Sequence, residues 1–271
     1  MRVLRVGQIS VALALAALAG GCKNSESPGT GQLSVVMADS PIVGVQSATV
    51  WISRVYLIGG ADSTGTRYTI SNTPQQYDLL TLQNGVTAAL GTTTIPVGNY
   101  TQLRMVVDSA RLTLSGGLTF VGGSASTTVM VPSGAQTGIK INFQGPVNVT
   151  PGQTILVVDF DAAANFHLTG PAGAPTGVLF TPLLNATVEN VAGSIAGKVA
   201  ADSTEKATIY AIFASSGDTL GSALADSATG TYKIWYLPPG AYHVVAVGSG
   251  LSATDTVTLG AAQNLTGVNF P

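Results

Sequence analysis

The chain has 271 residues, 45% hydrophobic and 9% charged, which is enough apolar material for one large or two modest domains. Residues 1–21 hold two of the 11 Lys and Arg and none of the 13 Asp and Glu, so their removal would leave 9 basic against 13 acidic residues, a net charge of −4. That balance argues against nucleic acid as a partner, because such binding depends on clustered Lys and Arg. A single cysteine excludes a disulfide within the chain.

The N-terminus has the pattern of a secretory signal peptide. Arg2 and Arg5 precede the short apolar run VALALAALAGGC, which is too short to span a bilayer because a spanning helix needs about 20 apolar residues. Ala19-Gly20-Gly21-Cys22 resembles a bacterial lipobox, which implies that residues 1–21 are a lipoprotein signal peptide and that Cys22 is lipidated. The alternative is an ordinary signal cleaved near Gly20, which would leave Cys22 as a free thiol.

Residues 22–30 are polar, contain Pro and Gly, and are predicted to form a flexible tether. Lys23 follows the cysteine, which by resemblance to Gram-negative lipoproteins implies sorting to the outer membrane. No second apolar run is long enough for a transmembrane helix. We therefore expect a cell-envelope protein whose one membrane contact is its N-terminal lipid.

From residue 31 onward, apolar alternation and frequent glycine predict an all-β fold. The run QTILVVDFD at residues 153–161 is the longest nearly continuous apolar strand, so we expect it at the centre of a sheet. Residues 86–90 are the one predicted turn of helix. The strands predicted in this first part are 32–38, 48–58, 68–70, 101–108, 111–114, 118–121, 127–131, 138–143, 153–161 and 180–188.

The strand pattern restarts near Asn190. Seven further strands are predicted at regular spacing, which is the count of a small β-sandwich. We therefore expect two β-sandwich domains, at residues 31–189 and 190–271. The seven predicted strands are 192–200, 207–213, 219–225, 231–237, 241–247, 254–259 and 264–270.

The first of these regions resembles domain-of-unknown-function family 4382, which is found in bacterial lipoproteins. The resemblance covers residues 31–189 and implies a location and a fold, but no activity, since the family has none established. The pieces that carry it, in family order, are GQLSVVMADSP, VWISRVYLIGG, YDLLTLQNG, IPVGNYTQLRMVV, VVDFDAAANFHLTG and FTPLLNATVE.

The second region resembles a carboxypeptidase-regulatory-like domain, a transthyretin-like sandwich related to carbohydrate-binding-like folds. The matching pieces are GSIAGKV from Gly193 and TGTYKIWYLPPGAYHVVAVGSG from Thr229. Leu237-Pro238-Pro239-Gly240 lies at the turn of the second piece, where proline pre-sets φ and glycine can supply a positive φ.

Catalytic and metal-ligating patterns are weak. The only histidines are His167 and His243, no GxSxG motif is present, and we expect neither an enzyme nor a cofactor. Asp159 and Asp161 lie two residues apart on a predicted strand and could hold calcium. The interpretation we favour is that they cap the strand end and accept backbone hydrogen bonds, so that the chain has no metal site.

Three aromatic residues of the second region are the candidate ligand-binding residues: Trp235, Tyr236 and Tyr242. An exposed aromatic ring could stack on a sugar, because it offers a large, ordered flat face. Alternation places Tyr232, Ile234 and Tyr236 on one face of the strand and Lys233, Trp235 and Leu237 on the other. That regularity is also typical of core packing, which is the interpretation we favour for Trp235.

The sequence thus predicts a non-enzymatic, lipid-anchored envelope protein that binds carbohydrate or another envelope component. The alternative is a structural, assembly or adhesion subunit displayed on the cell surface without a small ligand. An exposed aromatic cluster beside a groove would favour binding. A long free strand edge would favour assembly, because such edges recruit partner strands.

Overall fold

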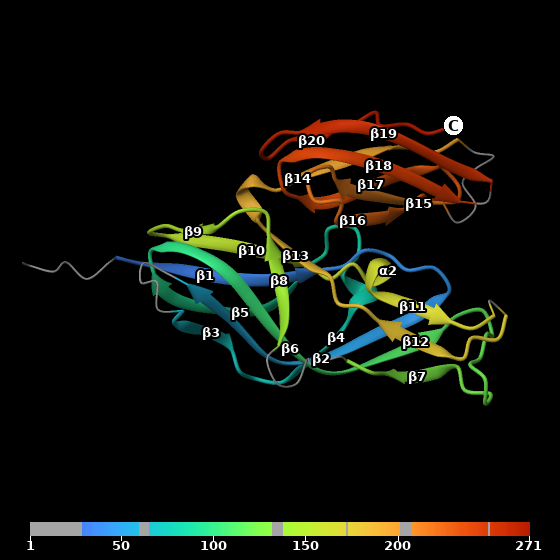
Figure 1. Cartoon of the computed structure of the whole chain (residues 1–271), viewed down its shortest axis with the longest axis horizontal. Helices are drawn as coiled ribbons and strands as arrows, with labels where there is room; N and C mark the ends of the chain where they lie inside the picture. Colours follow the sequence, from blue (N-terminus) through green and yellow to red (C-terminus); the bar gives the residue numbers. More distant parts are fainter. Residues whose placement is uncertain (1–28, 60–64, 132–137, 172, 201–206, 249) are drawn as a thin grey trace, which may run out of the picture.

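The computed structural model describes residues 29–59, 65–131, 138–171, 173–200, 207–248 and 250–271. Strands dominate these residues, and the predicted all-β, sandwich-type fold is confirmed. Figure 1 shows two groups of sheets lying along each other, here named the first unit (residues 29–191) and the second unit (residues 192–271). Cys22, the signal peptide and residues 22–28 of the tether lie outside the described residues.

The first unit is built on one sheet of eleven strands with the main order β3-β2-β6-β8-β13-β10-β1-β5, and a separate hairpin, β11–β12. Its strands are β1 (Thr30–Ala38), β2 (Val45–Gly59), β3 (Arg67–Ser71), β4 (Gln75–Asp78), β5 (Ala88–Pro96), β6 (Gly98–Leu114), β7 (Ser126–Val129), β8 (Ile139–Phe143), β9 (Val147–Val149), β10 (Gln153–Asp159), β11 (Phe166–Thr169), β12 (Gly177–Phe180) and β13 (Leu184–Val188). Its short helices are η1 (Leu79–Leu82), α2 (Ala162–Asn165) and η2 (Glu189–Val191).

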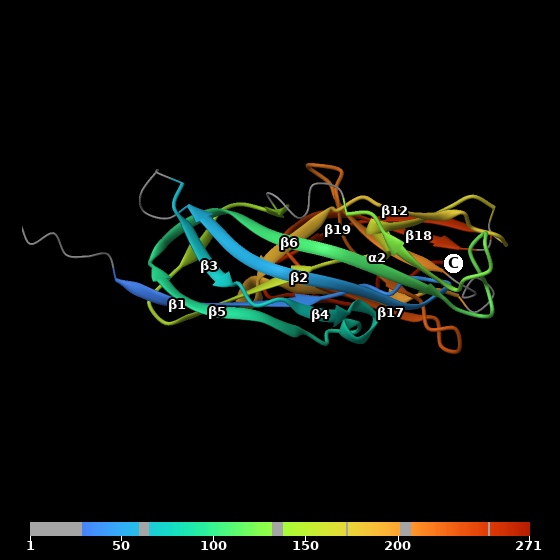
Figure 2. The same ribbon diagram turned by 90° about the horizontal axis from the view of Figure 1, so that it is seen from below.

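The long strands β2 and β6 run side by side along the first unit (Figures 1 and 2) and carry β-bulges that change which residues face the core. On β2 the core residues are Val50 and Ile52 before the bulge, then Val55 and Leu57 after it. The extra residue is Ser53, whose hydroxyl donates to Asp108 Oδ1 at 2.8 Å. A bulge inserts one residue and so reverses the inward alternation, which explains why Val50 and Val55 both face the core although they are an odd number of residues apart.

The sheet of the first unit curls until its end strands β3 and β5 meet. At that contact a Cβ on Gly91 would stand 2.8 Å from the Ile70 carbonyl oxygen, so only glycine fits there without a shift. Strand β10 lies inside the sheet between β13 and β1, as its apolar run predicts. The curled sheet encloses a continuous core that includes Leu33, Met37, Leu103 and Phe160.

In its described residues the second unit has two sheets, of order β17-β14-β20 and β16-β15-β18-β19, and these contain seven strands as predicted. The two sheets enclose their own buried cluster, which contains Ile195, Ile209, Ile234, Tyr242 and Phe270. The strands are β14 (Gly193–Lys198), β15 (Thr208–Phe213), β16 (Thr219–Leu224), β17 (Thr231–Leu237), β18 (Gly240–Gly248), β19 (Leu251–Leu259) and β20 (Asn264–Leu265).

Several local predictions are wrong. Residues 101–108 and 111–114 belong to one strand, β6, and of residues 264–270 only Asn264–Leu265 form a strand. Residues 86–90 are not helical, since 86–87 are irregular and 88–90 begin β5; the helical turn is η1, where Asp78 accepts a hydrogen bond from the Leu80 amide. Residues 118–121 form no strand, since they lie in a glycine-rich loop. Residues 180–188 are not one strand, because Pro182 separates β12 from β13.

None of the helices in the described part of the chain has the length and apolar character needed to cross a membrane.

Candidate functional site

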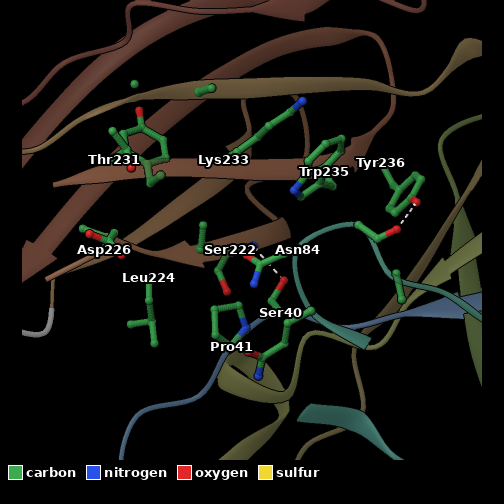
Figure 3. Close-up of a pocket in the computed structure, with 18 of the residues that line it drawn as sticks. Ser40, Pro41, Asn84, Ser222, Leu224, Asp226, Thr231, Lys233, Trp235 and Tyr236 are labelled. Carbon is green, nitrogen blue, oxygen red and sulfur yellow. Dashed lines mark hydrogen bonds between the residues drawn. The ribbon is translucent and has the colours of Figure 1, made fainter. Parts of the chain in front are cut away.

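A cleft of about 710 Å³ lies where the two units meet (Figure 3). The first unit contributes the segment after β1, around Ser40, and the turn between η1 and β5, around Asn84. The second unit contributes β16 and β17, with Lys233 and Trp235. Hydroxyl, amide, charged and aromatic groups therefore converge on one concavity, which is the usual composition of a ligand site between two structural units.

Trp235 lies at the junction of the units, half-buried, with both sides of its indole in contact. A Cβ on Gly85 would stand 3.3 Å from the indole Cδ2 and Cε2 atoms, so the backbone of the first unit lies against the ring. Lys233 Nζ lies 3.4 Å from the ring centroid, a cation–π contact. In Figure 3 the lysine reaches the indole from the side away from the Asn84 turn. Trp235 is thus neither a core residue of the second unit nor an open stacking platform.

Tyr236 joins the two units through a hydrogen bond. Its hydroxyl donates to the Gly85 carbonyl oxygen at 2.7 Å. Tyr236 has φ of 56°, and β17 has a bulge there relative to β14, so Leu237 faces the core where strict alternation places Tyr236. A tyrosine with a positive φ is strained. In this strained conformation the Tyr236 hydroxyl forms its hydrogen bond to Gly85.

Tyr242 does not belong to the cleft. It is fully buried in the core of the second unit, where its ring meets the edge of Phe213 and its hydroxyl donates to the Pro238 carbonyl oxygen at 2.6 Å. A ligand cannot reach it without unfolding the sandwich. The structure therefore corrects the sequence-based assignment of this residue to a ligand site.

Asp159 and Asp161 cap the end of β10, as the favoured interpretation predicts. Asp159 Oδ1 accepts from the Asp161 amide at 3.1 Å, and Asp161 Oδ1 accepts from the Ala164 amide at 3.1 Å at the start of α2. Asp39, directly after β1, completes a cluster by accepting from the Ala162 amide at 2.8 Å. Two oxygens of this cluster, Asp39 Oδ2 and Asp161 Oδ2, are buried without a hydrogen-bond partner.

The second unit packs directly on this cluster. Ser222 on β16 donates its hydroxyl hydrogen to Asp161 Oδ1 at 3.0 Å and its amide hydrogen to Ser40 Oγ at 3.3 Å. A Cβ on Gly221 would stand 3.2 Å from Asp159 Oδ2. The three carboxyls therefore lie beneath β16, at the floor of the junction.

Burial changes the protonation of all three acids. Removal from water raises the pKa of Asp39 and of Asp159 well above 3.8, and neighbouring aspartates raise both further. Burial raises the pKa of Asp161 to about 6, opposed by the hydrogen bonds from Ala164 and Ser222. The cluster therefore holds protons at a pH at which exposed carboxyls are ionised.

Asn165 orders the backbone around this cluster. Its side chain is fully buried, and its Nδ2 donates to the carbonyl oxygens of Phe160, Asp161 (2.9 Å) and Leu183 (3.2 Å). Its Oδ1 accepts from the Leu183 amide. One amide thereby joins the end of β10 to the segment before β13.

Other candidate groups lie elsewhere. His167 is exposed on β11, and His243 on β18 contacts Thr256 Oγ1 at 3.1 Å; neither lines the cleft. Within the described residues, no group of three or more His, Cys, Asp or Glu side chains is arranged to hold a metal ion.

Asp39, Asn84, Lys233 and Ser222 were not predicted as site residues. The signal for Asp39 is its position, because a polar residue directly after a buried strand either caps that strand or faces a site at the sheet end. For Asn84 and Ser222 no local signal exists, because each acquires its place in the cleft only when the two units meet.

Several solved structures match this chain at low similarity. The Bacillus anthracis TIE protein is 12% identical with a TM-score of 0.22, over 89% of this chain and 33% of that one. A leucine-rich repeat protein from Bacteroides thetaiotaomicron is 12% identical with a TM-score of 0.23, over 90% and 26%. A candidate adhesin from Bacteroides ovatus is 7% identical with a TM-score of 0.22, over 98% and 99%. This chain spans about a third and a quarter of the first two, and TM-scores this low carry no functional argument.

None of the curated proteins matches the sequence. A family model, in contrast, matches residues 30–180, which is more than half of the chain and covers β1 to β12. The protein therefore belongs to the family described as Domain of unknown function (DUF4382).

Proposed function

We propose that this protein is a non-enzymatic, lipid-anchored envelope protein that binds a carbohydrate in the cleft between its two units. The observation that carries the proposal is the composition of that cleft. A half-buried tryptophan and its lysine lie beside hydroxyl and amide side chains, among them Ser40, Asn84 and Thr231. Sugars bind through this combination, with apolar ring faces against aromatic carbon and hydroxyls on polar groups.

The state of Trp235 limits how the sugar would bind. Gly85 covers one side of the indole and Lys233 the other. The ligand therefore either contacts the indole edge, with the Lys233 ammonium in place to donate to a ligand hydroxyl, or displaces the lysine and stacks on the freed face of the indole. Truncation of Lys233 distinguishes the two modes: Lys233→Ala strengthens stacking if the lysine is displaced and weakens binding if the ammonium is a direct donor.

A glycan array with the mature protein tests the proposal, followed by titration of each hit against cleft variants. Asn84 is the most informative position to change, because it is exposed and has φ of 59°. Asn84→Gly removes the side-chain amide, and glycine adopts this backbone conformation without strain. Ala262→Gly is the matched control, since Ala262 also has a positive φ, 53°, and does not line the cleft. Binding lost in Asn84→Gly and kept in Ala262→Gly supports the cleft; equal binding in both, or no hit, contradicts it.

A second candidate function is assembly through a strand edge. Strand β19 ends the four-stranded sheet, pairs with β18 over its whole length, and has no strand on its other side among the described residues. Its sequence, LSATDTVTL, contains no Lys or Pro, the residues that commonly protect an edge. Thr256→Pro would block added pairing, and an assembly role predicts that the variant loses self-association in sedimentation experiments.

The membrane anchor is a separate part of the proposal and has its own test. Cys22→Ser should abolish palmitate labelling and release the protein from the membrane fraction. Unchanged labelling would contradict lipidation at this residue.

A further inference from the structure

Asp39 and Asp159 also line the cleft, but the carbohydrate proposal gives the buried carboxyls no part in binding, and the second unit lies directly on them. We propose that Asp39, Asp159 and Asp161 form a proton-controlled latch, in which loss of protons from the cluster loosens β16 from the first unit. This inference goes beyond the carbohydrate proposal and does not depend on it.

The first argument is geometric. Asp161 receives the Ser222 hydroxyl at 3.0 Å, and a Cβ on Gly221 would stand 3.2 Å from Asp159 Oδ2, so β16 covers the cluster. Two carboxyl oxygens, Asp39 Oδ2 and Asp161 Oδ2, lie buried with no donor. A buried carboxylate oxygen without a donor is costly, whereas a protonated carboxyl can share its hydrogen with a neighbouring carboxylate.

The second argument concerns the charges that face the cluster from each packed element. Tyr210 lies on β15, and the charge of Asp161 contributes to its raised pKa. Asp78 precedes η1, where its carboxylate accepts from the Leu80 and Ala48 amides. Glu189 lies on η2, whereas Asp226 and Lys233 lie on the cleft walls.

Residues beside the cluster do not neutralise it. On β13, Asn185 is the neighbour of Asp159, and its Nδ2 donates to the Thr219 carbonyl oxygen. No described Lys or Arg is among the groups that set the pKa of Asp39, Asp159 or Asp161. Ionisation therefore leaves negative charge at the junction that no described Lys or Arg offsets strongly enough to lower the pKa of these carboxyls.

The third argument concerns the direction in which pH changes the docking of β16. Withdrawal of β16 returns the carboxyls toward water, where an aspartate has a pKa near 3.8 rather than about 6 for docked Asp161. Between these two values the opening equilibrium constant rises about tenfold per pH unit for each proton released. Asp39 and Asp159, whose pKa values are also raised, extend the response to higher pH.

Trp235 provides the measurement, because it lies at the junction and is one of only two tryptophans. In a Trp51→Phe background it is the sole indole, and acrylamide quenching of its fluorescence reports whether Gly85 still covers it. We expect quenching of the full ligand-free chain to rise between pH 4 and pH 8, with a midpoint at or above about 6. The substitutions His167→Gln and His243→Gln, added together, exclude imidazole titration as the cause.

Two further variants test the cluster from its two sides. Asp39→Asn keeps the acceptor for Ala162 and cannot ionise, so it should reduce the amplitude of the pH response. Ser222→Ala removes a donor through which docked β16 stabilises ionised Asp161, so its quenching should exceed that of the Trp51→Phe protein as the cluster ionises. Asp255→Asn, on the exposed strand β19, should leave the response unchanged.

Flat quenching from pH 4 to 8 in the Trp51→Phe protein would overturn the latch, as would a Ser222→Ala variant whose quenching is no greater at any pH in that range. If Asp39→Asn fails to fold, the Trp51→Phe and Ser222→Ala measurements still decide. Because no ligand is used, these outcomes are independent of the glycan array.

Discussion

Gly85 lies against the indole of Trp235 across the junction: a Cβ on the glycine would stand 3.3 Å from two atoms of the indole. Gly85 has φ of 84°, so it is required both by its backbone conformation and by the close approach of the ring. The adjacent Tyr236 hydroxyl bonds to the carbonyl oxygen of the same glycine. This one turn of the first unit therefore positions the aromatic pair of the second.

Gly85→Ala should weaken the junction beyond the cost of a positive φ. A left-handed alanine costs roughly 1–2 kcal/mol, and the indole must also move. Gly44→Ala is the matched control, since Gly44 has φ of 77° and a Cβ added there would meet nothing within 4 Å. Denaturant midpoints should fall more for Gly85→Ala, and only that variant should increase acrylamide quenching of Trp235. Equal effects would show that the indole contact contributes nothing.

Trp235→Ala should have an effect between those of a core and a surface substitution. Truncation of a fully buried large side chain costs about 3–5 kcal/mol. Trp235 is half-buried and outside the core cluster of the second unit, so we expect a loss of about 1–2 kcal/mol in urea unfolding. A loss above about 3 kcal/mol would return Trp235 to the core interpretation favoured from the sequence.

The fold class was predictable, because alternation and glycine spacing depend on local chemistry alone. Which residues of a given strand face the core was not predictable. Strict alternation places Tyr236 on the same strand face as Ile234. Because of the bulge in β17, Leu237 lies on that core-facing side instead. Likewise, Ser53 and Asp108 are extra residues in β2 and β6 that pair with each other, and neither strand contains a signal for the bulge by itself.

The junction was beyond sequence reasoning for a different reason. Tyr236 and Gly85 are 151 positions apart, and no periodicity connects them. The pair Asp159 and Asp161 was visible as two acids on one strand, and its capping role followed from turn chemistry. Asp39 joins them only through the parallel pairing of β1 with β10, which places Ala38 beside Asp159.

Asn165→Asp should be far more damaging than its size suggests. The amide donates to three carbonyl oxygens and accepts from the Leu183 amide, all in a fully buried position. A carboxylate there would place an acceptor against three acceptors, whereas Asn165→Ala would only remove the bonds. We expect a loss of about 2–4 kcal/mol for alanine and a larger one for aspartate at neutral pH. Lowering the pH should narrow the difference in melting temperature from the unmodified protein only for the aspartate variant, as measured by thermal melting.

The stability of the protein should fall as pH rises through the acid range. The folded pKa of Asp161 is about 6 against 3.8 when exposed, so its contribution is complete below about pH 4 and is lost by about pH 6. That shift corresponds to about 3 kcal/mol in the free energy of unfolding, measured by urea titration at each pH. Burial also raises the pKa values of Asp39 and Asp159, so both contribute to the loss of stability with rising pH and extend it to higher pH.

Asp161→Asn should flatten this dependence. The exposed Asp226 is the control of opposite sign, because hydrogen bonds from Thr229 and Ala228 lower its pKa, so its contribution grows with pH. That contribution changes only below about pH 4, so Asp226→Asn should leave the fall between pH 4 and 6 nearly unchanged. A stability that rises from pH 4 to 6 in the unmodified protein would contradict the assignment of the buried acids.

A fragment of residues 191–271 should fold without the first unit. All members of its buried cluster, from Ile195 to Phe270, come from within the fragment, and its seven strands pair among themselves. What the fragment loses is the junction: Ser222 loses Asp161 as an acceptor, Tyr236 loses the Gly85 carbonyl, and one side of Trp235 becomes open. We therefore expect cooperative urea unfolding, a lower midpoint than in the full chain, and a tryptophan emission shifted to the red. Removal of the buried acids should also abolish the pH dependence between pH 4 and 6, so the fragment and the full chain should differ most at pH 4. A disordered fragment would show instead that the two sandwiches depend on each other to fold.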